Sequence, residues 1–308
     1  MERKRNKIVV IGSVNTDMII KSARLPKPGE TILGGVFSIV QGGKGANQAV
    51  AAAKAGGNTT FIARVGDDGF GETAINSYQL AGICTDFIIK DKTFPTGVAL
   101  INVSEQGENS ISVASGANAM LSVEDITACR DSIRSAGILL MQLETPIDTI
   151  HFAAGLAKSN NVTVILNPAP AQKLPDNLLA QVDILTPNET ETEILTGILP
   201  DTEENIKKAC DLLREKGIKT IIITLGAKGV YHSEIGFVKG FRVDAIDTTA
   251  AGDVFNGAFA VALSQGKGHL ESIVFANAAA ALSVQKLGAQ SSIPSISEID
   301  KFIMEWEN

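Results

Sequence analysis

The stretch Asp247-Thr248-Thr249-Ala250-Ala251-Gly252-Asp253 lies between two apolar segments, and the rest of the chain is organised around it. The segment before it, residues 243–246, is expected to be a short strand. In the segment after it, apolar side chains recur at the spacing of one helical face: Phe255, Ala258, Phe259, Ala262 and Leu263. Gly266 is expected to end that helix. A small-residue turn that opens a helix leaves backbone N–H groups free, so the stretch predicts an anion site.

Asp253 is unusual in this position, because a carboxylate beside a bound anion is electrostatically unfavourable. Such an acid is expected only where it has a use, such as a proton to be removed or a cation to be held. The stretch is therefore a candidate for chemistry as well as for binding.

The composition is that of a large α/β protein, with 308 residues, 44% of them hydrophobic, and 29 glycines. The net charge of −7 and the absence of a long basic run argue against nucleic acid or an anionic membrane as the main partner. The three cysteines, Cys84, Cys129 and Cys210, show no CxxC spacing, which favours a reducing compartment. The apolar run at residues 8–11 is shorter than the roughly 7–15 residues of a signal-peptide core. We therefore expect a cytoplasmic protein.

Strand-like and helix-like segments alternate over most of the chain, which predicts right-handed βαβ units. The expected fold class is α/β, with a central, mostly parallel sheet that carries helices on both faces. Residues 13–40 and 97–113 break the alternation. We expect these two inserts to form a small β appendage on a single domain that spans residues 1–308.

Polar residues follow several of the expected strands directly. Ligands of such sheets bind beyond the carboxyl ends of the strands, so these residues are expected on one side of the molecule. They are Asn15, Asp17, Glu144, Asn167, Asn188, Gly226 and the 247–253 stretch. Each alone would be an ordinary loop residue, and their shared side is what indicates a binding site.

A second glycine turn, Gly42-Gly43-Lys44-Gly45-Ala46-Asn47, also runs into an expected helix. Its glycines permit close approach to a ligand, and Lys44 and Asn47 have donors for hydroxyls or an anion. The same residues also suit an ordinary loop-to-helix turn. The turn does not satisfy GxxxxGK[ST], and no strand leads into GxGxxG, so the sequence contains neither a P-loop nor a dinucleotide-binding fingerprint.

Three further stretches each allow two interpretations. Asn15 and Asp17 could hold the two adjacent hydroxyls of a polyol, or form a solvated turn. Glu191 could hold a hydrated Mg²⁺, although Asn188-Glu189-Thr190-Glu191 is better explained as a helix N-cap. Residues 224–229 could contact a nucleotide or form a simple turn. The isolated histidines and the absence of HExxH argue against zinc.

Taken in order, the two glycine motifs resemble those of the ribokinase-like (PfkB-type) carbohydrate kinase superfamily. Val65-Gly66-Asp67-Asp68-Gly69-Phe70-Gly71 and Asn188-Glu189-Thr190-Glu191 are similar to stretches of the same superfamily. The likeness covers residues 11–294 and is greatest to the members that act on ribose. Many other members have glycine where this chain has Ala250, but only a backbone N–H is required there.

The resemblance implies ATP-dependent phosphorylation of D-ribose at O5, the first step of ribose catabolism. The alternatives are a kinase for a related substrate (deoxyribose, another pentose or adenosine) and a non-catalytic sugar-binding regulator on the same fold. Asn15 and Asp17 together favour a vicinal diol, and the scarcity of aromatics near residues 13–40 disfavours a nucleoside base. Asp253 argues against a regulator, and the missing fingerprint argues against a Rossmann-type oxidoreductase.

The resemblance also implies a role for individual residues. Asp253 matches the general base, with Ala250, Ala251 and Gly252 as the anion hole. The sugar-contacting positions are Asn15, Asp17, Gly43, Lys44, Asn47, Glu144 and Asp253. The ATP-contacting positions are Asn188, Thr224, Leu225, Gly226, Ala227, Lys228, Gly229, Gly252, Asp253 and Asn277.

The same resemblance implies metal ions and a partner. A monovalent cation, K⁺, is expected at Asp247, Thr249, Ser283, Lys286, Gly288 and Ser292. Mg²⁺ is expected with ATP, held through water by Glu191. The β appendage resembles a lid that closes over the sugar and joins two copies into a homodimer.

Overall fold

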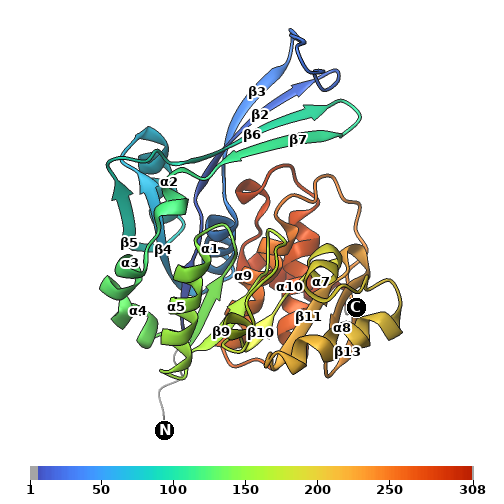
Figure 1. Cartoon of the computed structure of the whole chain (residues 1–308). Helices are drawn as coiled ribbons and strands as arrows, with labels where there is room; N and C mark the ends of the chain where they lie inside the picture. Colours follow the sequence, from blue (N-terminus) through green and yellow to red (C-terminus); the bar gives the residue numbers. More distant parts are fainter. Residues whose placement is uncertain (1–5, 307–308) are drawn as a thin grey trace.

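The computed structural model describes residues 6–306 and contains two separate β-sheets (Figure 1). The larger sheet is formed by β1 (Lys7–Ile11), β4 (Asn58–Gly66), β5 (Cys84–Asp91), β8 (Ile138–Met141), β9 (Thr163–Leu166), β10 (Ile184–Leu185), β11 (Thr220–Thr224), β12 (Gly229–His232) and β13 (Gly236–Lys239). The smaller sheet is formed by β2 (Asn15–Ser22), β3 (Val36–Gly42), β6 (Gly97–Ser104) and β7 (Asn109–Ala114).

Along the chain, most of the helices alternate with strands of the larger sheet, and the last ones follow its final strand. They are α1 (Lys44–Lys54), α2 (Gly69–Leu80), α3 (Val123–Ala128), α4 (Arg130–Arg134), α5 (Ile147–Lys158), α6 (Asp176–Leu179), α7 (Glu189–Thr196), α8 (Glu203–Glu215), α9 (Ala251–Ser264), α10 (His269–Ser283) and α11 (Ile296–Trp306). Short 3-10 helices span Gly116–Met120, Gly226–Lys228 and Gln290–Ser292.

The larger sheet has nine strands in the order β13-β12-β11-β10-β9-β8-β1-β4-β5. Pairing is parallel from β11 through to β5, and β12 and β13 add an antiparallel edge. A parallel sheet needs helical crossovers, which cover both of its faces. The structure confirms the predicted α/β fold class with a mostly parallel central sheet.

Strand β1 shows how both faces of this sheet are buried. Ile8 and Val10 belong to a core shared with α1, α9 and α10, whereas Val9 and Ile11 belong to a core shared with α5 and α8. All four side chains are completely buried. Because successive strand residues point to opposite faces, a continuous apolar run is what two covered faces require.

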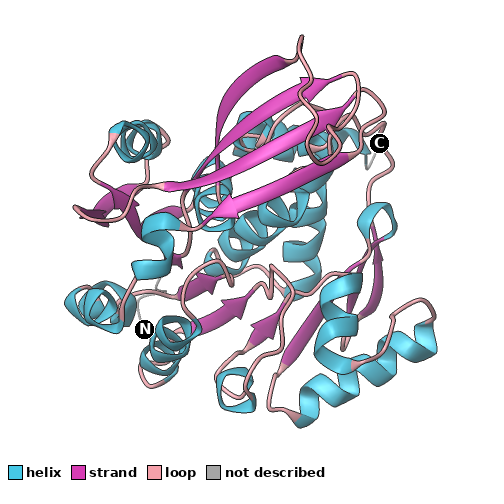
Figure 2. Ribbon diagram, turned by 45° about the horizontal axis from the view of Figure 1, so that its top comes forward, coloured by secondary structure: helices cyan, strands magenta, loops and turns pink. Residues whose placement is uncertain are grey.

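The smaller sheet projects from one end of the larger one (Figures 1 and 2). Its order is β3-β2-β6-β7, with β2 and β6 parallel and the two outer pairs antiparallel. These strands come from the two segments that break the βαβ alternation in the sequence. The segments extend slightly beyond the expected limits of 13–40 and 97–113, to Gly42 and Ala114.

The strand expected at residues 243–246 is wrong. The residues before the 247–253 stretch form a loop, and Ile246 is 64% exposed. The backbone N–H groups of Ile246 and Asp247 both donate to the carbonyl of Val284, at 2.7 and 3.1 Å. The loop is therefore tied to the end of α10 instead of to a strand of the sheet.

The helix expected after Asp253 is confirmed. Helix α9 buries Phe255, Ala258, Phe259 and Ala262 and ends at Ser264. The three cysteines are free thiols. None of the helices found between residues 6 and 306 combines the length and the apolar character needed to cross a bilayer.

Candidate functional site

The first turn of α9 supplies the backbone N–H groups of the predicted anion site. Ala250 caps this helix in the left-handed conformation, with φ 60° and ψ 10°, which costs a non-glycine residue roughly 1–2 kcal/mol. The Ala251 N–H makes a long bond of 3.3 Å to the Thr248 carbonyl. The N–H groups of Gly252 and Asp253 lie in the first turn, where a helix provides no acceptor. A Cβ added to Gly252 would meet nothing within 4 Å, so space remains open beside them.

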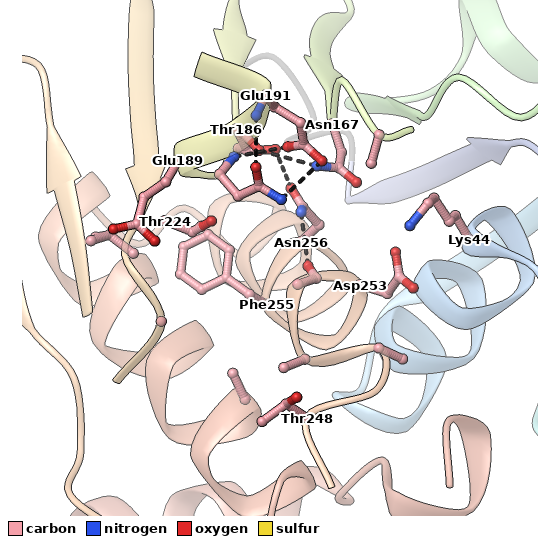
Figure 3. A pocket seen from close by; sticks show the side chains of 18 of the residues that line it. Lys44, Asn167, Thr186, Glu189, Glu191, Thr224, Thr248, Asp253, Phe255 and Asn256 are labelled. Atoms are coloured by element: carbon pink, nitrogen blue, oxygen red, sulfur yellow. Dashed lines mark hydrogen bonds between the residues drawn. The ribbon is translucent and has the colours of Figure 1, made fainter. Parts of the chain in front are cut away.

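Asp253 is buried in this turn, with a relative exposure of 6%. Its Oδ1 accepts from Gln48 Nε2 at 2.9 Å, and its Oδ2 accepts from Asn47 Nδ2 at 3.0 Å. Burial raises the pKa of Asp253, while the Lys44 ammonium and the two amide donors oppose this increase. Figure 3 shows the ammonium of Lys44 and the carboxylate of Asp253 pointing toward one another. A buried carboxylate with an elevated pKa and fixed donors is suited to accept a proton.

The second glycine turn brings α1 against the loop that follows β1. Gly43 has φ 90°, and a Cβ there would lie 2.7 Å from the Asn15 backbone nitrogen. A Cβ on Gly45 would lie 2.4 Å from the Ser13 nitrogen. Both glycines are thus required by close backbone approach: Gly43 caps α1, which begins at Lys44, and Gly45 lies in its first turn.

The predicted sugar residues surround the N-terminus of α1. Glu144 Oε2 accepts from the Lys44 backbone N–H at 3.0 Å and from the Ser13 hydroxyl. Asp17 is partly buried near Glu144; burial first, and the charge of Glu144 second, raise its pKa to about 6. A Cβ on Gly42 would lie 2.2 Å from Asp17 Oδ2, so this glycine makes room for the carboxylate.

The amide side chains of Asn15 and Asn47 already form hydrogen bonds within the protein. Asn15 Oδ1 accepts from Asn118 Nδ2 at 2.8 Å, which leaves the amide nitrogen of Asn15 for a ligand. Asn47 donates to Asp253, and its Oδ1 accepts from Gln290 Nε2 at 3.2 Å. Asn47 therefore supports the carboxylate of Asp253 directly.

A cavity of about 470 Å³ opens between α9, α10, α7 and the end of β11 (Figure 3). Among the residues predicted to contact ATP, the following line it: Asn188, Thr224, Gly226, Gly229, Gly252, Asp253 and Asn277. Leu225, Ala227 and Lys228 do not; the Leu225 side chain lies in the apolar core, and the other two are exposed. Of the predicted sugar residues, Lys44 and Asp253 also line this cavity, so they lie where the two groups meet.

Glu191 and Asn188 form a helix cap at the wall of the cavity. Asn188 Oδ1 accepts from the Glu191 N–H at 2.8 Å, and both carboxylate oxygens of Glu191 accept from Asn188, at 2.8 and 3.1 Å. The capping interpretation is confirmed. Burial raises the pKa of this glutamate. Among residues 6–306, no three His, Cys, Asp or Glu side chains are grouped to hold a metal, so a cation here would need water or phosphate oxygens.

Asp247 joins the loop before α9 to the segment after α10. Its carboxylate accepts from the N–H of Thr249 at 2.9 Å and from the N–H of Gly288 at 2.8 Å. The Lys286 ammonium points elsewhere, to Glu298 at 3.1 Å. Ser283 and Ser292 donate their hydroxyls to carbonyls of their own turns. The residues predicted for a monovalent cation thus belong to two segments that Asp247 connects.

Sequence reasoning did not assign a role to several buried polar residues of the site. Gln48, Gln142, Thr186, Asn256 and Asn118 are all at most 1% exposed and hydrogen-bonded around the predicted site residues. Gln48 follows Asn47 in the glycine motif, and Asn256 lies one helical turn after Asp253. Their position beside the motifs could have indicated a role for Gln48 and Asn256. Their hydrogen-bond partners, however, are remote in the sequence.

The model of the pfkB family carbohydrate kinases matches residues 5–296 of this chain. The chain belongs to this kinase family. A curated ribokinase of Haemophilus influenzae is 50% identical to this kinase, over 97% of this chain and 99% of the relative. A deoxyribokinase of Salmonella typhi is 39% identical over 96% and 98% of the two chains. The structure of Arabidopsis thaliana ribokinase with ribose and ATP superposes with a TM-score of 0.90 at 36% identity, over 97% of the kinase and 98% of that chain.

Proposed function

We infer that this kinase transfers the γ-phosphoryl group of ATP to the 5-hydroxyl of D-ribose, giving D-ribose 5-phosphate and ADP. The observation that carries the inference is Asp253, a buried carboxylate at the open N-terminus of α9. It lies where the cavity meets the residues around the glycine turn. The ribokinase relative at 50% identity supports ribose as the acceptor.

Asp253 is the proposed general base. It accepts the proton of the sugar hydroxyl while the hydroxyl oxygen attacks the γ-phosphorus. Each of its oxygens is held by one amide, which leaves further lone pairs for the hydroxyl. Its burial raises its pKa toward the working pH, which makes it a better proton acceptor.

The proposed anion hole consists of the N–H groups of residues 250–253, with those of Gly252 and Asp253 free of helical acceptors. They and the dipole of α9 stabilise the negative charge that develops on the transferred group. When bound, Mg²⁺ would neutralise phosphate charge, and Glu191 would hold it through water. Lys44 adds a positive charge beside Asp253.

Ribose is proposed to bind at Asn15, Asp17, Gly43, Lys44, Asn47 and Glu144, beside Asp253. Asp17 would accept from two adjacent sugar hydroxyls, which a carboxylate can do with its two oxygens. ATP is proposed to occupy the cavity at Asn188, Asn277 and residues 224–229. Backbone groups alone would serve at Leu225, Ala227 and Lys228, whose side chains do not line that cavity.

K⁺ is proposed to bind between the two segments that Asp247 joins, at Asp247, Thr249, Ser283, Lys286, Gly288 and Ser292. Lys286 would contribute only its carbonyl, because its ammonium pairs with Glu298. A cation there would hold the loop that precedes the anion hole, without touching the substrates.

The smaller sheet is proposed to act as a lid over the sugar and as the interface of a homodimer. The face that carries Asp17 also carries Ile101, Ile111 and Val113, according to the register of β2, β6 and β7. Ile111 and Val113 are 54% and 55% exposed. One ribose molecule is too small to bury these exposed apolar side chains, so we propose that the smaller sheet of a second copy packs against them. The use of ATP and the three free thiols favour a cytoplasmic location.

Deoxyribose is the alternative substrate, because a deoxyribokinase is 39% identical over nearly the whole chain. A coupled assay of ADP release across pentoses, hexoses and nucleosides, with and without K⁺, separates the candidates. We expect the highest kcat/KM for ribose and a lower rate without K⁺. A higher value for deoxyribose would select the alternative.

The role of Asp253 is tested in the same assay with Asp253→Asn. We expect kcat to fall by at least ~10²-fold, the lower range for a general base, while ribose binding measured by calorimetry is largely retained. A kcat close to that of the unsubstituted enzyme would remove Asp253 from the mechanism.

A further inference from the structure

Two buried amides, Asn167 and Gln48, link the backbone carbonyl of Thr186, just after β10, to the carboxylate of Asp253, and a third, Gln142, contacts Gln48. Asn167 Nδ2 donates to the Thr186 carbonyl at 3.1 Å. Asn167 Oδ1 accepts from Gln48 Nε2 at 3.1 Å, and the same nitrogen donates to Asp253 Oδ1 at 2.9 Å. Gln142 Nε2 donates to Gln48 Oε1 at 2.6 Å. Gln48 thus uses both of its amide hydrogens and its oxygen.

The orientation of each of these amides follows from the contact of Asn167 with Thr186. A backbone carbonyl can only accept, so Asn167 must turn its nitrogen toward Thr186 and its oxygen toward Gln48. Gln48 must therefore present its nitrogen to Asn167 and to Asp253. If Gln48 were flipped, its oxygen would face two acceptors and its nitrogen would face the amide nitrogen of Gln142. Buried groups do not tolerate such contacts.

We propose that Gln48, held by Asn167 and Gln142, is a positioning residue that keeps the Asp253 carboxylate ionised and oriented toward the sugar hydroxyl. This inference rests on the proposed role of Asp253 as the general base. Gln48 cannot take a proton from the sugar itself, since a side-chain amide is not a base near neutral pH, and its oxygen already accepts from Gln142. It acts by donating a hydrogen bond to one oxygen of the base, on the opposite side of the carboxylate from Asn47.

Several charged side chains surround Asp253 and act on its ionisation together with the amide of Gln48. Lys44 on α1 faces Asp253 with a positive charge, and Glu144 after β8 and Glu191 on α7 face it with negative ones. Burial and the two acids favour the protonated form of Asp253, whereas Lys44 and the amide donors favour the ionised form. Removing the donor at residue 48 should therefore shift the balance toward protonation.

The test is the pH profile of kcat at saturating ribose, whose acid limb reports the base in the enzyme–substrate complex. In Gln48→Met, which keeps the size of the side chain but removes the donor, we expect the limb to move up by about 1–2 pH units. In Gln48→Glu, which keeps the shape, the added carboxyl shares a proton with Asp253 and moves the limb in the same direction. In Gln142→Met the shift should be smaller, because only the orientation of Gln48 is weakened.

Thr149→Val is the matched control, because it removes a buried hydrogen bond of 2.8 Å to the Leu121 carbonyl, at α5 on the other face of the sheet. It should lower Tm without moving the acid limb. If the limb of Gln48→Met coincides with those of the control and the unsubstituted enzyme, Gln48 has only a structural role and the proposal is wrong. If instead Asp253→Asn retains full activity, the proposed base is wrong, so the two failures are distinguishable.

Discussion

At the scale of single residues, Asp17 combines a cost in stability with a proposed role in sugar binding. Its pKa is raised to about 6 from the ordinary 3.8, first by burial and then by Glu144. Between these pH values the folded protein holds a proton that the unfolded chain has released. The free energy of unfolding contributed by this group therefore decreases as the pH rises through that window.

Asp17→Asn removes this titration and the charged partner proposed for the sugar. At pH 7 we expect the free energy of unfolding to rise by about 1–2 kcal/mol, a value reduced for solvent screening, and the gain to vanish below about pH 4. The ribose KM should rise roughly 10–100-fold, the loss expected for a hydrogen bond to a charged group. Urea unfolding at the two pH values and ribose titrations at pH 7 measure both effects. A variant that is destabilised at pH 7, or one with unchanged KM, contradicts the assignment.

At the scale of elements, His232 connects β12 to the start of α10. Its ring is fully buried; Nδ1 accepts from the N–H groups of Glu234 and Ile235, at 3.1 and 3.2 Å. Since Nδ1 must accept, Nε2 carries the proton and donates to His269 Nδ1 at 2.8 Å. Burial, followed by the neighbouring His269, lowers the pKa of His232 to about 4.

The unfolded chain therefore binds a proton at His232 between about pH 6.5 and pH 4, while the folded protein does not. Stability from this contact is present above pH 6.5 and is lost as the pH falls through that window, by about 2 kcal/mol. In His232→Asn, whose carbonyl can still accept from the two N–H groups, we expect a correspondingly smaller loss. Urea unfolding midpoints between pH 7 and pH 4.5 provide the measurement, and parallel curves for the two proteins would argue against the contribution.

At the scale of the whole molecule, the smaller sheet is the proposed interface of a homodimer. We expect Ile111→Glu to weaken self-association, because a charge on the face that carries Asp17 would have to be buried against the partner. Phe37→Glu is the matched control: Phe37 is 56% exposed and lies on the opposite face of the sheet, paired with Ile20. Light scattering with size-exclusion chromatography gives the mass of each variant. A monomeric control with a dimeric Ile111 variant would assign the interface to the other face.

Much of the local structure could be predicted from the sequence. The apolar spacing after Asp253 predicted α9, and Asn188 with Glu191 predicted a cap that the structure contains. Such signals are local, because capping residues and periodic faces lie within one or two turns of each other. The strand prediction failed at residues 243–246, because a short apolar run is compatible with a strand. In the structure these residues form a loop that is hydrogen-bonded to the end of α10 and exposes Ile246.

The sequence by itself determined the two glycine turns, the helix that begins at Ala251 and the acid in its first turn. Only the tertiary structure decided that Asp253 is held by Asn47 and Gln48, and that Gln48 is oriented through Asn167 from the backbone of Thr186. The physical reason is distance along the chain. Asp253 is about 200 residues from its donors. A hydrogen bond between such remote residues leaves no periodicity or spacing in the sequence from which it could be predicted.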